Sequence, residues 1–189
     1  MEELMQAPNG LDEVRATFGN PFLDDGTLDT EWEAANIRRA APPDGWELYY
    51  QKSATELVRV SAISMHVLVE ANFLAAMDEI WNYAKLQLDP AASDDEVRAW
   101  LHQLRLDVTG GGYNFRKIRG ANAPSMHAFG IAIDWDPLHN PQVRKPVAGQ
   151  PVPHTLPDWW YDIWATHGWS DGRHFSRPDP MHVQFATGC

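Results

Sequence analysis

A ten-residue stretch in the last third of the chain joins two polar side chains to a short apolar segment: Ser125-Met126-His127-Ala128-Phe129-Gly130-Ile131-Ala132-Ile133-Asp134. The apolar run predicts a buried strand over residues 130–135. Because side chains alternate between the two faces of a strand, Asp134 lies opposite the two isoleucines. The stretch therefore places a histidine, His127, and a carboxylate on one rigid element.

A second polar cluster lies about fifty residues later, where Asp179 precedes His182 by three residues at the start of a strand predicted over 181–185. Together, His127, Asp134 and His182 offer two imidazoles and one carboxylate. Catalytic zinc is held by three ligands of this kind, which leave a fourth position to water. Asp179 is a further acid beside this set, suited to take a proton from that water and return it to a leaving amine.

Other polar residues compete for the ligand roles. We interpret Asp136 as part of a turn and His174 as a residue at the rim of the site. An isolated histidine is weak evidence for a site, so the remaining five are interpreted as hydrogen-bonding residues of the surface or core. These are His66, His102, His139, His154 and His167.

A basic segment precedes the first cluster: Tyr113-Asn114-Phe115-Arg116-Lys117-Ile118-Arg119-Gly120. A guanidinium can bind a substrate carboxylate or stabilise a developing oxyanion. Arg116 is the first choice for this role and Arg119 the second. The alternative is a solvated basic loop that balances the acidic N-terminal residues.

Composition excludes several classes of protein. The 189 residues are 44% hydrophobic, enough for one core, and we expect a monomer. A net charge of −11 argues against a nucleic-acid partner. The most apolar segment, 67–77, is interrupted by Glu70 and Asn72, so no membrane segment is expected. The single Cys189 excludes an internal disulfide. The acidic first residues do not resemble a secretory signal, so we expect synthesis in the cytoplasm.

Periodicity and capping signals predict the remaining elements. The expected helices are 11–18, 30–39, 65–86, 93–103 and 156–167, and the expected strands are 54–63, 106–109, 130–135 and 181–185. This order predicts one α+β domain over residues 1–189, in which a small antiparallel sheet carries the site and helices cover its other face. Residues 1–46 are rich in turn signals and are expected to form an irregular arm packed on a catalytic core at 54–185.

The ten-residue pattern is Ser-x-His-x-x-Gly-x-Ala-x-Asp, and with the later acid-x-x-His it resembles the zinc D-alanyl-D-alanine carboxypeptidases. That family includes phage L-alanyl-D-glutamate endopeptidases, and the hedgehog signalling domain has a related fold. The resemblance covers roughly residues 58–185. Tyr-Asn-x-Arg-x-Ile-Arg-Gly at 113–120 and Gly168-Trp169 favour the phage-like branch, whose members would act on the cell wall after release by phage lysis.

The resemblance implies a peptidoglycan stem-peptide peptidase with one zinc ion bound by His127, Asp134 and His182. Asp179 would be the general base and acid, although many members of the family carry Glu at this place. The residues implied in substrate binding, or in orienting the site for it, are Arg116, Arg119, Ser125 and Tyr113. The choice between endopeptidase and carboxypeptidase stays open. The alternative function is a non-catalytic, zinc-containing binding module of hedgehog-like fold.

Overall fold

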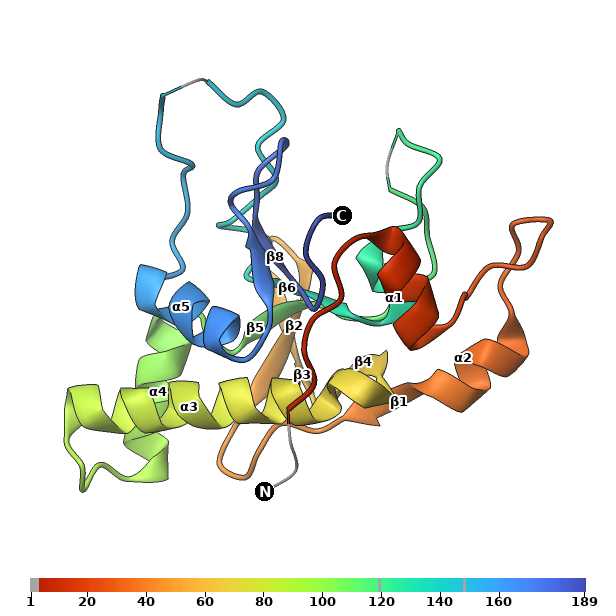
Figure 1. The fold of residues 1–189 in the computed structure, drawn as a ribbon. Helices are drawn as coiled ribbons and strands as arrows, with labels where there is room; N and C mark the ends of the chain where they lie inside the picture. Colours follow the sequence, from red (N-terminus) through yellow and green to blue (C-terminus); the bar gives the residue numbers. More distant parts are fainter. Residues whose placement is uncertain (1–3, 119, 148) are drawn as a thin grey trace.

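The computed structural model describes residues 4–118, 120–147 and 149–189 of the chain, which form both helices and short strands (Figure 1). The helices are α1 (Leu11–Phe18), α2 (Thr30–Asn36), α3 (Glu70–Leu88), α4 (Asp94–Gln103) and α5 (Asp158–Thr166), with single 3-10 turns η1 (Val67–Val69) and η2 (Met126–Phe129). The strands are β1 (Ile37–Ala40), β2 (Leu48–Ser53), β3 (Glu56–Val60), β4 (Ile63–His66), β5 (Val108–Gly111), β6 (Ala132–Trp135), β7 (Ser170–Gly172) and β8 (Asp179–Gln184). None of the helices that the structure describes has the length and hydropathy needed to cross a bilayer.

Six strands form one sheet in the order β3-β2-β5-β6-β8-β7, and β1 pairs with β4 in a second, two-stranded sheet. The α+β class predicted from the sequence is confirmed. The prediction of a small antiparallel sheet is wrong, because β2 and β5 pair in parallel and the sheet is therefore mixed. Strand β2 was not predicted, since residues 48–53 mix aromatic and polar side chains without β-branched residues.

Two predicted elements are divided in the structure. The helix expected over 30–39 ends at Asn36, whose side-chain amide donates to the Trp32 carbonyl at 2.8 Å, and the chain continues as β1. The strand expected over 54–63 is two strands, because the chain bends after β3 and β4 joins β1 instead of the larger sheet. The helix expected from residue 65 begins later, at Glu70, because residues 65 and 66 belong to β4.

Helices α3, α4 and α5 pack together on the sheet (Figure 1). The helix predicted over 93–103 begins with a capping box, in which the Ser93 hydroxyl accepts from the Glu96 N–H and the Glu96 carboxylate accepts from the Ser93 N–H. Trp160 and Trp164 of α5 are fully buried, as expected for core residues at helical spacing. Strand β7, only three residues long, had no recognisable sequence signal.

The N-terminal arm lies against the rest of the chain through hydrogen bonds as well as apolar contacts. The Phe18 carbonyl, at the end of α1, accepts from Trp32 Nε1 at 2.7 Å and lies 3.3 Å from His66 Nε2. Near the chain's other end, the Thr187 carbonyl accepts from the Gly10 N–H at 2.7 Å. Val14 and Phe18 of α1 belong to the same hydrophobic core as α3 and β6.

Candidate metal centre

His127 is oriented by the short turn that carries it. The turn η2 begins at Ser125, whose hydroxyl accepts from the His127 N–H at 3.3 Å. It ends at Gly130, which has a φ of 70°. Gly130 approaches β4 so closely that a Cβ there would lie 2.7 Å from the backbone nitrogen of His66. The serine and the glycine of the sequence pattern therefore start and stop the turn that presents His127.

Asp134 and His182 come together through strand pairing. Strands β6 and β8 are antiparallel neighbours, and their register places Asp134 directly opposite His182. Residues opposite each other on adjacent strands have their side chains on the same face of the sheet, about 5 Å apart at Cβ. Two stretches nearly fifty residues apart thus deliver a carboxylate and an imidazole to one point.

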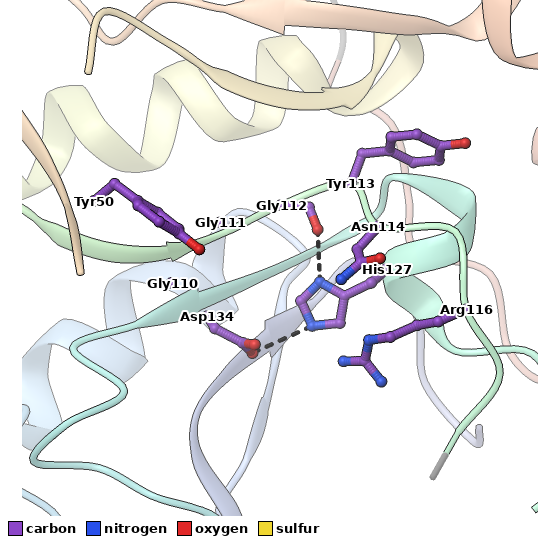
Figure 2. Close-up of a pocket in the computed structure, with 9 residues that line it drawn as sticks. All are labelled: Tyr50, Gly110, Gly111, Gly112, Tyr113, Asn114, Arg116, His127 and Asp134. Carbon is purple, nitrogen blue, oxygen red and sulfur yellow. Dashed lines mark hydrogen bonds and ion pairs between the residues drawn. The ribbon is translucent and has the colours of Figure 1, made fainter. Parts of the chain in front are cut away.

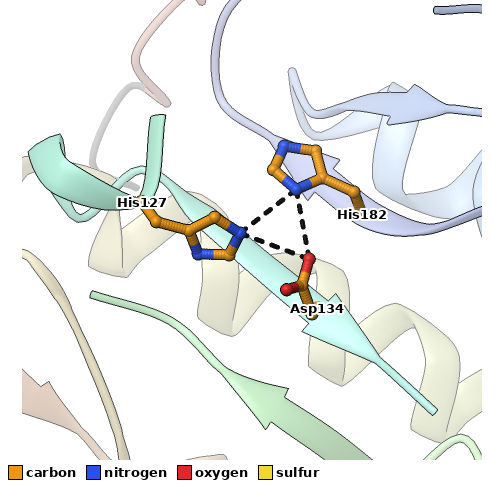
Figure 3. Close-up of side chains that lie close together, drawn as sticks. All are labelled: His127, Asp134 and His182. Carbon is orange, nitrogen blue, oxygen red and sulfur yellow. Dashed lines mark hydrogen bonds and ion pairs between the residues drawn. The ribbon is translucent and has the colours of Figure 1, made fainter. Parts of the chain in front are cut away.

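Three donor atoms of these side chains form a compact triangle (Figure 3). His127 Nε2 lies 3.2 Å from Asp134 Oδ1 and 3.2 Å from His182 Nδ1, and His182 Nδ1 lies 3.1 Å from the same carboxylate oxygen. His127 and His182 are buried, and Asp134 is partly buried. Within the part of the chain that the structure describes, no other histidine, cysteine or acid joins this group.

The outer nitrogen of each imidazole is bound to an acceptor, which leaves the inner one free to accept. His127 Nδ1 donates to the Gly112 carbonyl at 2.7 Å, and His182 Nε2 donates to Gln184 Oε1 at 3.1 Å. The Gln184 amide is oriented in turn by donation to the Ala186 carbonyl at 3.2 Å. Acceptors behind metal-binding histidines select the tautomer and hold the ring in place, so both rings direct a lone pair into the triangle.

The triangle fits a zinc ion. Tetrahedral zinc with ligand distances of about 2.0–2.1 Å separates its ligand atoms by about 3.3 Å, and the three atoms here are 3.1–3.2 Å apart. Two nitrogens and one oxygen are the donor types that zinc accepts. The three residues are therefore able to hold the metal that the sequence predicts.

The charges of the group are strongly coupled. Burial would raise the pKa of Asp134, but the charges and hydrogen bonds of His127 and His182 outweigh it and hold that pKa well below its ordinary value. Burial lowers the pKa of His182, yet the hydrogen bond and charge of Asp134 outweigh this and raise it. The carboxylate is thus ionised throughout the neutral range, as a metal ligand must be.

Asp179 reaches the neighbourhood of the triangle through a bulge in β8. Gly172 pairs with Asp179 while the preceding Asp171 pairs with Val183, so β8 has extra residues at this point. A regular strand would place residues three apart on opposite faces, and the bulge removes that constraint. Burial raises the pKa of Asp179, and the Asp134 charge adds to this, while the His182 charge opposes it. Gln142 Nε2 donates to Asp179 Oδ2 at 3.1 Å.

A cleft of about 200 Å³ opens beside His127 and Asp134 (Figure 2). The exposed Arg116 lies on its wall, next to His127. The wall also contains Asn114 of the basic segment, Tyr50 of β2 and the glycines 110–112, none of which the sequence marks as a site residue. Nothing in the local sequence marks Tyr50, because only the pairing of β2 with β5 brings it to the site.

The remaining predicted residues take different places. Arg119 lies outside the described residues. Tyr113 lines the cleft, but Figure 2 shows its phenol turned away from His127, and burial raises the pKa of this phenol above its ordinary value. Asp136 is buried, and its Oδ1 lies 2.7 Å from Arg105 Nε. It stands outside the metal group, in line with its interpretation as a turn residue. The exposed His174 likewise stands outside it.

A family comparison agrees with this geometry. Residues 119–185 match the family model of D-alanyl-D-alanine carboxypeptidase. This confirms the resemblance drawn from the sequence. The matched stretch is about a third of the chain and contains His127, Asp134, Asp179 and His182, whereas Arg116 precedes it. No curated protein and no solved structure matches the chain significantly.

Proposed function

We propose that the protein is a zinc-dependent peptidase that hydrolyses a peptide bond in peptidoglycan stem peptides. The observation that carries the proposal is the convergence of three lone pairs, from His127, Asp134 and His182, beside an open cleft. The match of the surrounding stretch to the carboxypeptidase family supports the same chemistry. The activity would be that of an endolysin-type L-alanyl-D-glutamate endopeptidase or of a D-alanyl-D-alanine carboxypeptidase.

Each side chain has a role in this reaction. Zinc bound at the triangle would polarise the scissile carbonyl and lower the pKa of a water. Asp179 would take the proton from the attacking water and pass it to the leaving amine, a task favoured by its raised pKa. Arg116, exposed at the cleft beside His127, would bind a substrate carboxylate. Gly112 and Gln184 would keep both imidazoles in the orientation that binds the metal.

The number of ligands favours an enzyme over the non-catalytic module. Structural zinc is usually closed by four protein ligands, while catalytic zinc keeps one position open. Two observations support an open, catalytic site: the candidate group has three members among the described residues, and Asp179, a half-buried acid, is influenced by the charges of His182 and Asp134. An acid near the ligands suits proton transfer, which a site that serves only stability or recognition does not require.

The proposal is tested by mass spectrometry of synthetic stem peptides after incubation with the zinc-loaded protein. We expect one bond to be cleaved, cleavage to stop with a chelator, and cleavage to return with added zinc. The identity of the bond distinguishes the two activities.

His127→Ala should lose both zinc and cleavage. Asp179→Asn should keep its zinc and lose at least about 100-fold in rate, because proton transfer contributes that much. Turnover by metal-free protein would refute the proposal.

A further inference from the structure

One wall of the cleft comes from a strand far from the family-matched stretch. Tyr50 belongs to β2 and has 40% of its surface exposed. Figure 2 shows its ring extending from β2 toward the cleft, with the hydroxyl end toward Asp134. The preceding Tyr49 lies on the opposite face of the strand, where its ring meets that of His102 and its hydroxyl donates to Glu47 at 2.8 Å.

Between Tyr50 and Asp134, the strand that lines the cleft carries no side chains. This segment is Gly110–Gly112, the end of β5 and the residue after it, which follows directly after the last pair between β2 and β5. A Cβ on Gly110 would lie 3.1 Å from the Asp134 Cβ, Gly111 has a φ of 106°, and a Cβ on Gly112 would lie 2.7 Å from Ile63 Cγ2. Alanine is thus disfavoured at each position, by crowding at Gly110 and Gly112 and by the backbone conformation at Gly111, and the result is a strip of backbone without side chains.

Bare backbone suits a peptide substrate. A ligand chain can approach the strip closely, since no side chain of the strand stands in its way. The large aromatic ring at one end of the strip offers apolar area and a hydrogen-bonding hydroxyl.

The cleft has a cation at one end and this ring at the other. Figure 2 places Arg116 and Tyr50 on opposite sides of His127 and Asp134. A peptide whose carboxylate is held by Arg116 therefore continues past the two ligands toward Tyr50. We propose that Tyr50 binds the segment of the peptide that lies across the scissile bond from this carboxylate, and so determines which stem peptides are accepted. This inference rests on the proposed function.

The test compares Tyr50→Ala with Tyr49→Ala, a substitution of the same residue type on the other face of the same strand. With a synthetic stem pentapeptide, kcat/KM of the zinc-loaded Tyr50→Ala protein should fall about tenfold, and that of Tyr49→Ala should stay within twofold. Tyr50→Phe separates the two contributions, since it keeps the ring and removes the hydroxyl. Zinc content and thermal unfolding show that each variant is folded and loaded.

Binding provides a second measurement that does not depend on turnover. In an Asp179→Asn background, calorimetry with the same zinc-loaded protein and intact peptide should give a Kd about tenfold weaker when Tyr50→Ala is added. Cleavage and binding that are unaffected by Tyr50→Ala, or equally affected by Tyr49→Ala, would overturn this inference alone. Tyr50-dependent binding without cleavage by the unmodified protein would overturn the proposed function alone.

Discussion

Arg105 and Asp136 form an ion pair of 2.7 Å, and both residues have a left-handed backbone, with φ of 58° and 40°. Such conformations are uncommon outside glycine and persist where other contacts hold them. The Asp136 carboxylate is 1% exposed, and its backbone N–H donates to the Val108 carbonyl at 2.8 Å. The pair therefore ties the end of β6, just after Asp134, to the start of β5.

We expect Asp136→Ala to lower the free energy of unfolding by about 3 kcal/mol, because it leaves Arg105 without its buried partner. Urea unfolding measures the change. The matched control is Asp95→Ala, which removes an ion pair with Arg98 in which the Asp95 side chain is 89% exposed. That change should cost less than about 1 kcal/mol. Equal losses in the two variants would show that burial of the Asp136 pair has no special weight.

Gly110 is packed against the candidate ligand Asp134. Its backbone is compatible with alanine, but the new Cβ would lie 3.1 Å from the Asp134 Cβ and 3.2 Å from Pro137 Cγ. We expect Gly110→Ala to displace the carboxylate and weaken zinc affinity about tenfold, the effect typical of residues behind a ligand. Competition with a fluorescent chelator measures the affinity.

Gly26→Ala is the control for this measurement. Gly26 has a φ of 82° with nothing near its Cα that a Cβ would meet, so alanine there strains the backbone without crowding a ligand. It should cost stability and leave zinc affinity unchanged. If Gly110→Ala binds zinc as tightly as the unmodified chain, the contact with Asp134 has no influence on the metal.

His66 should make stability depend on pH. It is buried, its Nδ1 accepts from the Leu68 N–H at 3.2 Å, and burial lowers its pKa to about 4, despite the opposing hydrogen bond to Phe18. The unfolded chain, with an ordinary histidine, binds a proton near pH 6.5, whereas the folded protein does not. This contribution to stability is complete above pH 6.5 and is lost as the pH falls toward 4, by about 3 kcal/mol in all.

His66→Asn tests this dependence, because its amide oxygen can replace Nδ1 as the acceptor while no titratable ring remains. Urea unfolding between pH 4 and 7 should show a shallower fall in stability for the variant than for the unmodified chain. Parallel curves for the two proteins would assign the pH dependence to other groups.

The capping box of α4 gives a prediction about a single helix. The Ser93 hydroxyl satisfies the Glu96 N–H at the helix start, a bond that is typically worth about 1 kcal/mol. We expect Ser93→Ala to lower the free energy of unfolding by about that amount, while Ser93→Thr, which keeps a hydroxyl, changes it by less than half. Chemical denaturation of both variants measures the difference.

The candidate metal ligands could be predicted from the sequence because each signal is local. His127 stands in a turn with its own cap and stop, and Asp134 stands in an apolar strand whose alternation shows its face. His182 stands in a second short strand, and the pairing of β6 with β8 brings it to Asp134. The signal for α4 is equally local, and the helix predicted over 93–103 begins directly after its cap, Ser93.

The cleft around these ligands could not be predicted in the same way. Tyr50 reaches it through a parallel pairing of strands separated by α3 and α4, a contact that no periodicity reveals. The direction of Tyr113 follows a glycine with a φ of 106°, which breaks the alternation used to assign faces. The Gly112 carbonyl has no side-chain signature, but Gln184 could have been noticed, two residues after His182 on the same strand.

The position of β6 in the sheet limits how this protein can be shortened. Strand β6 lies between β5 and β8, and of these two neighbours β8 belongs to the family-matched stretch whereas β5 precedes it. A fragment cut to residues 119–185 would keep the candidate metal ligands but expose the edge of β6 from which β5 had been removed. Unpaired strand edges promote self-association, so such a fragment should aggregate, and work on the isolated centre will need the strands that precede it.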